Sequence, residues 1–366
     1  MQNNKKFWIG VVAGVFFLVL FFTTVDQGSL RDVLFSANYW FVVPAIGAYL
    51  VSVGFRALRW QWLLRHLRPI SALRLYPVVV IGYMANNLMP MRLGELVRSY
   101  YVGEREGISK TSALVTIFVE RLLDAFTLLL FIAVVALFAP VLGLVGAFEG
   151  RHGLFWLLVS IGLSAIFIFA LVTLIFLAFR PSKARATIRL VARFLPSGMH
   201  AQVLDFGNLA LDGLASLRSP KDILILCILS VPVWLLEVFL FYLIGFSFCL
   251  DLVYGGWVEM FVVMVLVTSV ANIGSSIPMA PGGLGIFEWV ARETLVLLPL
   301  ATVDIAVATG FVAVVHFSLL MSMIILGQVF LLIHQVSLVS LSRRGQARTI
   351  EIEERSDSSF VEEEVS

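Results

Sequence analysis

Six charged side chains interrupt apolar segments of this chain: Arg92, Glu95, Arg98, Glu120, Arg121 and Asp124. The last three stand in the run IFVERLLDAFTLLL. At helical spacing Glu120 and Asp124 share one face, and Arg121 lies within one turn of Asp124. Ionisable groups inside a membrane helix are costly unless they are paired or hydrated, so they usually face the protein interior and mark a pathway for a ligand or for protons. An anion-binding or proton-carrying role is therefore the functional interpretation.

A second segment, IPMAPGGLGIFE, combines residues that break a helix with one carboxylate. Its candidate residues are Pro281, Gly282, Gly283, Gly285 and Glu288. Pro281 lacks a backbone N–H and glycine adopts conformations that other residues avoid, so we expect a helix to stop here and to restart near Leu284 or Gly285. A helix that begins inside the protein presents free N–H groups and partial positive charge to phosphate or carboxylate. The same is expected after Pro90.

Both sets of residues also have a structural interpretation. The charges around residue 120 could form a clamp that holds the first interrupted segment through Arg92 or Arg98. The interrupted segments could be buried hairpins in which glycine permits close helix packing. A clamp and a ligand pathway can coexist, so the sequence leaves both open.

The elements that must position these residues are membrane helices. Hydrophobic residues make up 60% of the 366 residues, charged residues only 14%, and the mean hydropathy is +0.97. Such a chain has too little polar surface for a soluble domain. The net charge of +2 gives no reason to expect a nucleic-acid partner. Two cysteines, five scattered histidines and no phosphate-binding loop give no reason to expect a metal or a cofactor.

Apolar runs of about 20 residues predict six membrane spans. They lie at about residues 7–25, 39–55, 109–139, 154–179, 222–248 and 301–334. Two further apolar segments, about residues 73–103 and 257–298, are interrupted by Asn, Gly and Pro and are predicted to be re-entrant hairpins. The predicted fold is all-α, a polytopic membrane protein with about six full spans and two re-entrant helical hairpins.

Basic residues predict the orientation, because Lys and Arg beside membrane spans stay on the cytoplasmic side. Lys5 and Lys6 precede the first span, arginines from Arg56 to Arg74 follow the second, and Arg343 follows the last. We therefore expect a multi-pass protein of the cytoplasmic (inner) membrane with both termini in the cytoplasm. This orientation requires the first hairpin to enter from the cytoplasm and the second from outside.

The two hairpins share a short sequence pattern. In each, an Asn precedes Pro-x-x-Leu-Gly, at residues 90–94 and 281–285, and a glutamate and an arginine follow. Interrupted segments at matching places in two halves, entering from opposite faces, are typical of inverted-topology repeats in transporters. We therefore expect an inverted repeat.

The segments outside the spans have simpler predictions. Residues 182–217 alternate arginines with apolar residues and are predicted to form amphipathic helix on the cytoplasmic face. Residues 339–366 are polar and highly charged, and they are predicted to form a disordered cytoplasmic tail. Residues 1–338 would then form one transmembrane domain.

Three motifs, in the order NLMPMRLGELVRSYY, SKTSALVTIFVERLLD and IPMAPGGLGIFE, resemble the transmembrane flippase-like domain of the lysylphosphatidylglycerol synthase family. The resemblance extends over roughly residues 5–335 and implies a stand-alone membrane domain without the C-terminal synthase domain, so aminoacyl transfer is not expected. It implies that the candidate residues named above take part in lipid movement. His316 stands where many members carry an arginine, so the resemblance does not carry over the identity of the lipid.

The leading hypothesis is translocation of a lipid between the leaflets of the cytoplasmic membrane. The lipid would be an anionic or modified phospholipid or would carry another lipid-linked headgroup. One alternative is an enzyme or an enzyme partner in lipid-linked glycan or glycolipid synthesis, and a further one is an ion or small-solute carrier. The leading hypothesis expects no enzymatic activity and no cofactor. Its expected partners are membrane lipids and a separately encoded lipid-modifying synthase, and the sequence does not give the oligomeric state.

Overall fold

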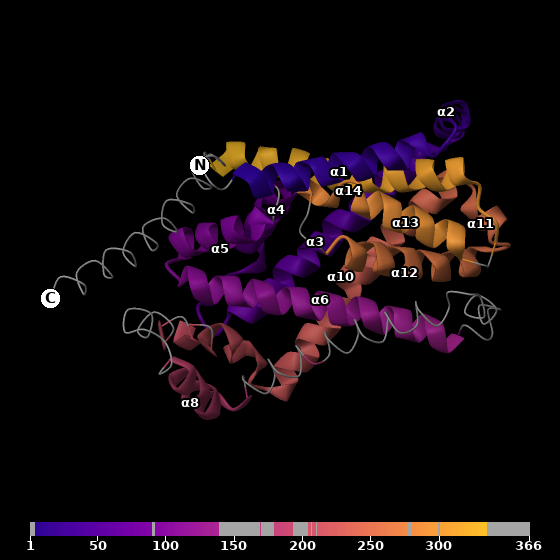
Figure 1. Cartoon of the computed structure of the whole chain (residues 1–366). Coiled ribbons are helices and arrows are strands. Elements are labelled where there is room, and N and C mark those ends of the chain that lie inside the picture. Colours follow the sequence, from indigo (N-terminus) through magenta and orange to yellow (C-terminus); the bar gives the residue numbers. More distant parts are fainter. Residues whose placement is uncertain are drawn as a thin grey trace.

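The computed structural model describes the chain at residues 4–89, 92–138, 169, 179–192, 204–205, 207–209, 211–276, 280–298 and 301–334. Within these ranges all regular structure is helical, which confirms the predicted all-α class. Figure 1 shows long helices that run side by side in one bundle. Pro90, most of the predicted span at 154–179 and the predicted tail at 339–366 lie outside the described residues.

The helices of the first half are α1 (Asn4–Thr23), α2 (Gln27–Ser36), α3 (Val42–Leu64), α4 (Ala72–Leu88), α5 (Leu93–Glu106) and α6 (Lys110–Phe138). Those of the second half are α8 (Pro181–Ala192), α10 (Pro220–Ser247), α11 (Leu250–Val253), α12 (Trp257–Gly274), α13 (Ile286–Leu297) and α14 (Ile305–His334). Short 3-10 turns are η1 (Tyr39–Phe41), η3 (Leu214–Leu217) and η4 (Pro281–Gly283).

Among the described residues, four helical stretches are long and apolar enough to cross a membrane. They are Tyr39–Leu64, Pro220–Ser247, Trp257–Gly274 and Ile305–Ile333. Three of them coincide with predicted spans, and the chain is a multi-pass membrane protein. The remaining stretch is α12, which was predicted as one arm of a hairpin. Its 18 residues are enough by length alone to cross the hydrocarbon layer.

The second span, helix α3, extends farther along the chain than predicted. The helix continues past residue 55 to Leu64, and Arg56 and Arg59 lie inside it with exposed fractions of only 4% and 0%. Their assignment to a cytoplasmic loop was therefore wrong. The physical reason is that α6 supplies carboxylates to both side chains and α10 supplies one to Arg56, so burial costs less than their charge alone suggests. Arg68 and Arg74 are exposed, as expected of residues beyond a span.

Two helical hairpins face each other in the middle of the bundle. Helices α4 and α5 form the first hairpin, and α12 and α13 form the second. In Figure 1 the first hairpin lies toward the end of the bundle where α1 begins and α14 ends, and the second lies toward the opposite end, beside α11. The tips meet, because Arg92 Nη2 in the first donates to the carbonyl oxygen of Ser275 in the second at 3.2 Å.

Helix packing repeats between the two halves. Helix α6 packs against α12, and its counterpart α14 packs against α4. The helix before each hairpin, α3 in one half and α10 in the other, packs along its counterpart. Each hairpin also packs on the helix that follows it, α5 on α6 and α13 on α14. This reciprocal arrangement is the one that an inverted-topology repeat produces.

The segment predicted as amphipathic contains α8 and packs on the bundle. Arg185 and Arg189 are exposed, whereas Ala184 is buried. Farther along, the hydroxyl of Ser112 in α6 donates to the carbonyl oxygen of Leu209 at 3.1 Å. The segment is therefore attached to the bundle at Leu209 and through η3, which contacts α3, α6 and α10. Residues 193–203 within it lie outside the described residues, and its cytoplasmic position stays a prediction.

The close approach of the first hairpin's arms depends on glycine. A Cβ atom added at Gly94 in α5 would lie 2.0 Å from the carbonyl oxygen of Gly82 in α4, and backbone cannot move aside as a side chain can. We expect Gly94→Ala to lower the free energy of unfolding by about 1–3 kcal/mol, the usual cost of overpacking. The measurement is the thermal unfolding midpoint of the purified protein in detergent.

The matched control is Gly47→Ala in α3, where an added Cβ would meet nothing within 4 Å. Alanine favours helix over glycine by about 1 kcal/mol, so this variant should unfold at or slightly above the wild-type temperature. Equal unfolding midpoints for the two variants would contradict the close packing of the hairpin arms.

Candidate functional site

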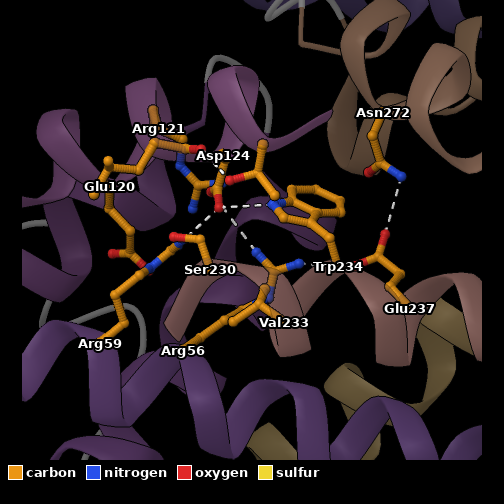
Figure 2. Close-up of polar contacts among 12 residues, drawn as sticks. Arg56, Arg59, Glu120, Arg121, Asp124, Ser230, Val233, Trp234, Glu237 and Asn272 are labelled. Carbon is orange, nitrogen blue, oxygen red and sulfur yellow. Dashed lines mark hydrogen bonds and ion pairs between the residues drawn. The ribbon is translucent and has the colours of Figure 1, made fainter. Parts of the chain in front are cut away.

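A buried arginine on α3 joins three helices. Arg59 Nη2 lies 2.8 Å from Asp124 Oδ1 and 3.2 Å from Glu120 Oε1 on α6, and its Nη1 donates to Ser230 Oγ on α10 at 2.9 Å. Figure 2 shows the Arg59 side chain reaching toward α6, where the two carboxylates share one face. A charge with no water around it is stable only with such partners, so this group holds α3, α6 and α10 together.

Arg56, nearly one turn earlier on α3, forms a second set of contacts. Its Nη2 pairs with Glu237 Oε2 on α10 at 2.7 Å, its Nη1 donates to the hydroxyl of Tyr83 at 3.0 Å, and its guanidinium lies over the Trp234 ring at 4.8 Å. The other oxygen of Glu237 accepts a hydrogen bond from Asn272 on α12 at 3.0 Å (Figure 2). These contacts connect α3 and α10 to α12 of the second hairpin.

The first hairpin is attached to α6 by two ion pairs. Arg98 Nη2 lies 3.0 Å from Glu120 Oε2, and its guanidinium stacks over Trp60 at 4.2 Å. Arg121 Nε lies 3.1 Å from Glu95 Oε1. The clamp that the sequence left open through Arg98 is therefore present in the structure.

Arg92 occupies the tip of the first hairpin in an unusual conformation. Its φ of 53° and ψ of 37° are left-handed, which costs a non-glycine residue about 1–2 kcal/mol. Its Nη1 is 3.9 Å from the carboxylate of Glu95, and its Nη2 donates to the carbonyl oxygen of Ser275. The other four arginines of the site each have a carboxylate within 3.1 Å, so Arg92, whose side chain is 32% exposed, is the least neutralised of the five. Strain of this kind is often kept at functional sites.

The hairpin tips close around a polar cavity of about 160 Å³. Three arginines line it from three elements: Arg56 on α3, Arg92 at the first tip and Arg121 on α6. Gly282 and Gly283 of the second tip also line it.

The connected charges are not balanced. The arginines are Arg56, Arg59, Arg92, Arg98 and Arg121, and the carboxylates are Glu95, Glu120, Asp124 and Glu237. Five arginines against four carboxylates leave one positive charge beside the cavity.

An apolar groove of about 470 Å³ adjoins the polar cavity. Phe22 of α1, Leu284 after the second tip, and Ala313 and Phe317 of α14 are among its lining residues. His316 and Leu320 line both spaces, so together they form the boundary between them.

The second hairpin places Glu288 and His316 side by side. His316 Nδ1 is 2.8 Å from Glu288 Oε1, and His316 Nε2 is 3.1 Å from the carbonyl oxygen of Gly282. Glu288 Oε2 accepts the backbone N–H of Gly285 at 2.7 Å. At the start of α13, where an anion site was predicted, the N–H of Gly285 thus already has the carboxylate of Glu288 as its acceptor, and anion binding by the first turn stays a prediction.

Nine of the eleven predicted site residues separate into three places. Arg92, Arg121, Gly282 and Gly283 line the polar cavity, and Glu288 lines the apolar groove. Arg98, Glu120 and Asp124 lie in the buried cluster beside the cavity, and Glu95 joins that cluster to the tip through Arg121. Pro281 begins η4, and Gly285 packs against α1, because a Cβ added to it would lie 2.5 Å from the carbonyl oxygen of Gly14.

Sequence reasoning missed Arg56 and Arg59 as members of the site. The run FRALRWQWLL keeps apolar residues among its arginines, and this continuing pattern was the signal for a longer helix. For a metal the structure offers no candidate within the described ranges, since no three His, Cys, Asp or Glu side chains gather there.

Comparison with known proteins gives one family. Residues 7–327 match the family model described as the lysylphosphatidylglycerol synthase TM region. A UPF0104 membrane protein of Methanothermobacter thermautotrophicus is 28% identical over 291 residues, which cover 75% of this chain and 80% of that protein.

Two further relatives match over shorter stretches. Glycosyltransferase AglD of Haloferax volcanii is 31% identical over 120 residues, 32% of this chain and 19% of that protein. A UPF0104 membrane protein of Methanocaldococcus jannaschii is 30% identical over 130 residues, 34% of this chain and 38% of that protein. No solved structure matches the chain significantly. Because the family model covers nearly the whole described bundle, this chain belongs to the lysylphosphatidylglycerol synthase transmembrane-region family.

Proposed function

We propose that this protein moves a lipid with an anionic, phosphate-containing headgroup between the two leaflets of its membrane. The observation that carries the proposal is the polar cavity beside the apolar groove, with His316 and Leu320 lining both. A lipid needs such a pair of spaces, one for a charged headgroup and one for a hydrocarbon chain. An ion or a small polar solute would have no use for the groove.

The charges around the cavity favour phosphate. Guanidinium groups bind phosphate oxygens through paired hydrogen bonds, and Arg56, Arg92 and Arg121 approach the cavity from different elements. The single excess positive charge of the cluster matches in magnitude the single negative charge of one phosphodiester. A headgroup of that charge would neutralise the site, and Arg92, which has the weakest carboxylate contact, would be its main partner.

The arrangement of the hairpins supports movement across the membrane. Transporters built from inverted repeats bind their substrate where the repeats meet and open the site alternately to either side. Here the cavity lies between the two tips, and the hairpins reach it from opposite ends of the bundle (Figure 1). In the cytoplasmic membrane, with both termini inside, a headgroup would pass between the tips while its chain stays in the groove or the bilayer.

The test is leaflet exchange of headgroup-labelled lipids in vesicles that contain the purified protein. The lipid panel is phosphatidylglycerol, phosphatidylethanolamine, a polyprenyl phosphate and a phosphate-free glycolipid. We expect exchange above that of protein-free vesicles for at least one phosphate lipid and not for the glycolipid. Absence of exchange for the whole panel, with the protein folded, would contradict the proposal.

A change in the apolar groove provides an independent prediction. Ala313→Trp places an indole in the space where the chain of the lipid would lie, so we expect exchange to fall at least about tenfold while the protein stays folded. The matched control is Ala133→Trp on the exposed face of α6, which should keep the wild-type rate. If both variants exchange lipid at the wild-type rate, the groove does not hold the chain.

A second candidate function comes from the resemblance to glycosyltransferase AglD. In this alternative the same cavity holds a lipid-linked substrate for glycan or glycolipid synthesis, and the protein works with a separately encoded lipid-modifying enzyme. Turnover of a lipid-linked sugar in detergent, where no leaflets exist, would favour this candidate over translocation.

A further inference from the structure

His316 makes two contacts at once, and their geometry specifies where its protons lie. Its Nε2 is 3.1 Å from the carbonyl oxygen of Gly282. A carbonyl oxygen only accepts hydrogen bonds, so Nε2 must carry a hydrogen. On the other side of the ring, Nδ1 is 2.8 Å from Glu288 Oε1. Two lone pairs would repel at that distance, so a second proton lies between Nδ1 and the carboxyl oxygen.

The pair therefore holds one proton more than a neutral histidine beside a carboxylate. Whether that proton is on the imidazole or on the carboxyl group, the pair as a whole is electrically neutral. Both side chains are buried, His316 and Glu288 each at 4% exposure, where a neutral pair is far less costly than a single charge. The ring of Phe287 stacks on the imidazole at 4.2 Å and limits its reorientation.

Loss of that proton must break one of the two contacts. A neutral imidazole carries a single hydrogen, which can serve Glu288 or Gly282 but not both. A carboxylate is a stronger acceptor than a backbone carbonyl, so the hydrogen would stay on Nδ1. The Nε2 lone pair would then face the carbonyl oxygen of Gly282, and the second tip would lose this link to α14.

The equivalent contact in the first half cannot respond in this way. There Glu95, which directly follows Gly94, pairs with Arg121 on α6 at 3.1 Å. In the second half Glu288 pairs with His316 on α14, the helix that corresponds to α6. Arginine stays charged at all physiological pH values, whereas histidine changes charge between about pH 5 and 8. One hairpin is thus held by a permanent ion pair and the other by a pair that can gain or lose a proton.

We propose that Glu288 and His316 form a proton-binding site, and that proton release frees the second hairpin tip and so couples lipid movement to a proton gradient. The coupling rests on the proposed lipid translocation, but the proton site does not. The proton reaches the pair through the polar cavity, which His316 lines together with Gly282 and Gly283. Movement of these two glycines changes the wall of the headgroup cavity itself.

Other charged groups around the pair define its surroundings. Arg56, Arg92, Arg121 and Glu237 line the same cavity from α3, the first tip, α6 and α10. On α13, Arg292 lies one turn after Glu288, where it pairs with Glu293 and donates to the carbonyl oxygen of Phe21 in α1. The cavity that His316 lines is thus shared with three arginines and one carboxylate, and a bound anionic headgroup would add a negative charge to it.

The proton site is tested by a distance measurement that does not depend on transport. Spin labels are attached at Ser276→Cys, beside the second tip, and at Ser36→Cys on α2, after replacement of Cys227 and Cys249 with alanine. Distances between the labels are measured in vesicles from about pH 5 to 8, the range in which histidine changes charge. We expect a second distance population that grows several-fold as the pH rises.

His316→Gln cannot change its charge, and it should lose this pH response. Glu288→Gln is the second variant. It removes the carboxylate but keeps a carbonyl oxygen that can accept the N–H of Gly285, and it should also lose the pH response. The matched control is His66→Gln, two residues after the end of α3, where the exposed side chain lies 3.6 Å from Asp222, and it should keep the response. Distances that do not change with pH in the wild-type protein, or an unchanged response in His316→Gln, would overturn the proton site.

Coupling is then tested by lipid exchange with a pH gradient across the vesicle membrane. A gradient should change the wild-type exchange rate several-fold and leave the His316→Gln rate unchanged. A gradient that changes both rates equally would overturn the coupling. If the tip responds to pH but no lipid is exchanged, the proposed function fails and the proton site stands.

Discussion

Replacing Arg92 with alanine is expected to reduce lipid exchange by about 10-fold to 100-fold without loss of folded protein. Hydrogen bonds to a charged partner contribute about 1.5–3 kcal/mol each, which corresponds to this range of rates if the headgroup phosphate is bound mainly by Arg92. The fold should tolerate the change, because the polar contacts of the Arg92 side chain are a hydrogen bond to one carbonyl oxygen and a carboxylate 3.9 Å away. The measurement is the leaflet-exchange rate in vesicles of equal protein content.

Two variants make this result specific. Arg31→Ala removes an exposed arginine from α2, far from the cavity in the chain and outside its lining, and should exchange lipid at the wild-type rate. Arg92→Lys keeps the charge but loses the paired donors, and should fall between Arg92→Ala and the wild type. Wild-type exchange by folded Arg92→Ala would remove Arg92 from the headgroup site and leave the proposal without its main phosphate contact.

Replacing Arg59 with methionine is expected to have the largest effect on stability. The substitution keeps much of the side-chain volume but leaves Glu120 and Asp124 without their shared partner in a fully buried place. Removal of one partner from a buried ion pair usually costs about 3–5 kcal/mol, because the remaining charge has no water around it. We expect a much lower yield of folded protein and a lower thermal unfolding midpoint in detergent.

A second substitution should restore part of this loss. Arg59→Met combined with Glu120→Gln removes one positive and one negative charge together, so the cluster keeps the net charge that it has in the wild type. This double variant should unfold at a higher temperature than Arg59→Met alone, which is the result that distinguishes charge balance from simple loss of packing. Arg74→Met, at an exposed arginine of α4, serves as the control and should leave the midpoint unchanged. An Arg59→Met protein as stable as the wild type would show that the buried cluster does not hold the helices together.

The positions of the α6 charges illustrate how far sequence reasoning reached. Spacing alone placed Glu120 and Asp124 on one helix face, and in the structure both contact the same Nη2 of Arg59. Spacing did not identify that arginine, which lies 61 residues before Glu120 in the chain. It also did not show that Arg98 and Glu120 lie beside the cavity while Arg92 and Arg121 line it.

The His316 contacts show a second limit of the sequence. Glu288 and His316 are 28 residues apart, and each is surrounded by apolar residues in its own helix. The pairing arises because α13 folds back on α12 and packs against α14, which brings both side chains to the same boundary between cavity and groove. The sequence pattern of one helix does not identify the residues of another helix that pack against it.

The amino-acid sequence by itself determined an all-helical membrane protein with two interrupted segments in matching halves. The physical reason is local: lipid offers no hydrogen-bond partners, so apolar runs must be helical, and proline and glycine mark where a helix must stop. Only the tertiary structure decided which charges neutralise one another and which of them face an open space. Those outcomes depend on contacts between residues far apart in the chain, such as Arg59 with Ser230 where α3 packs on α10, and Arg92 with Ser275 where the two hairpin tips meet.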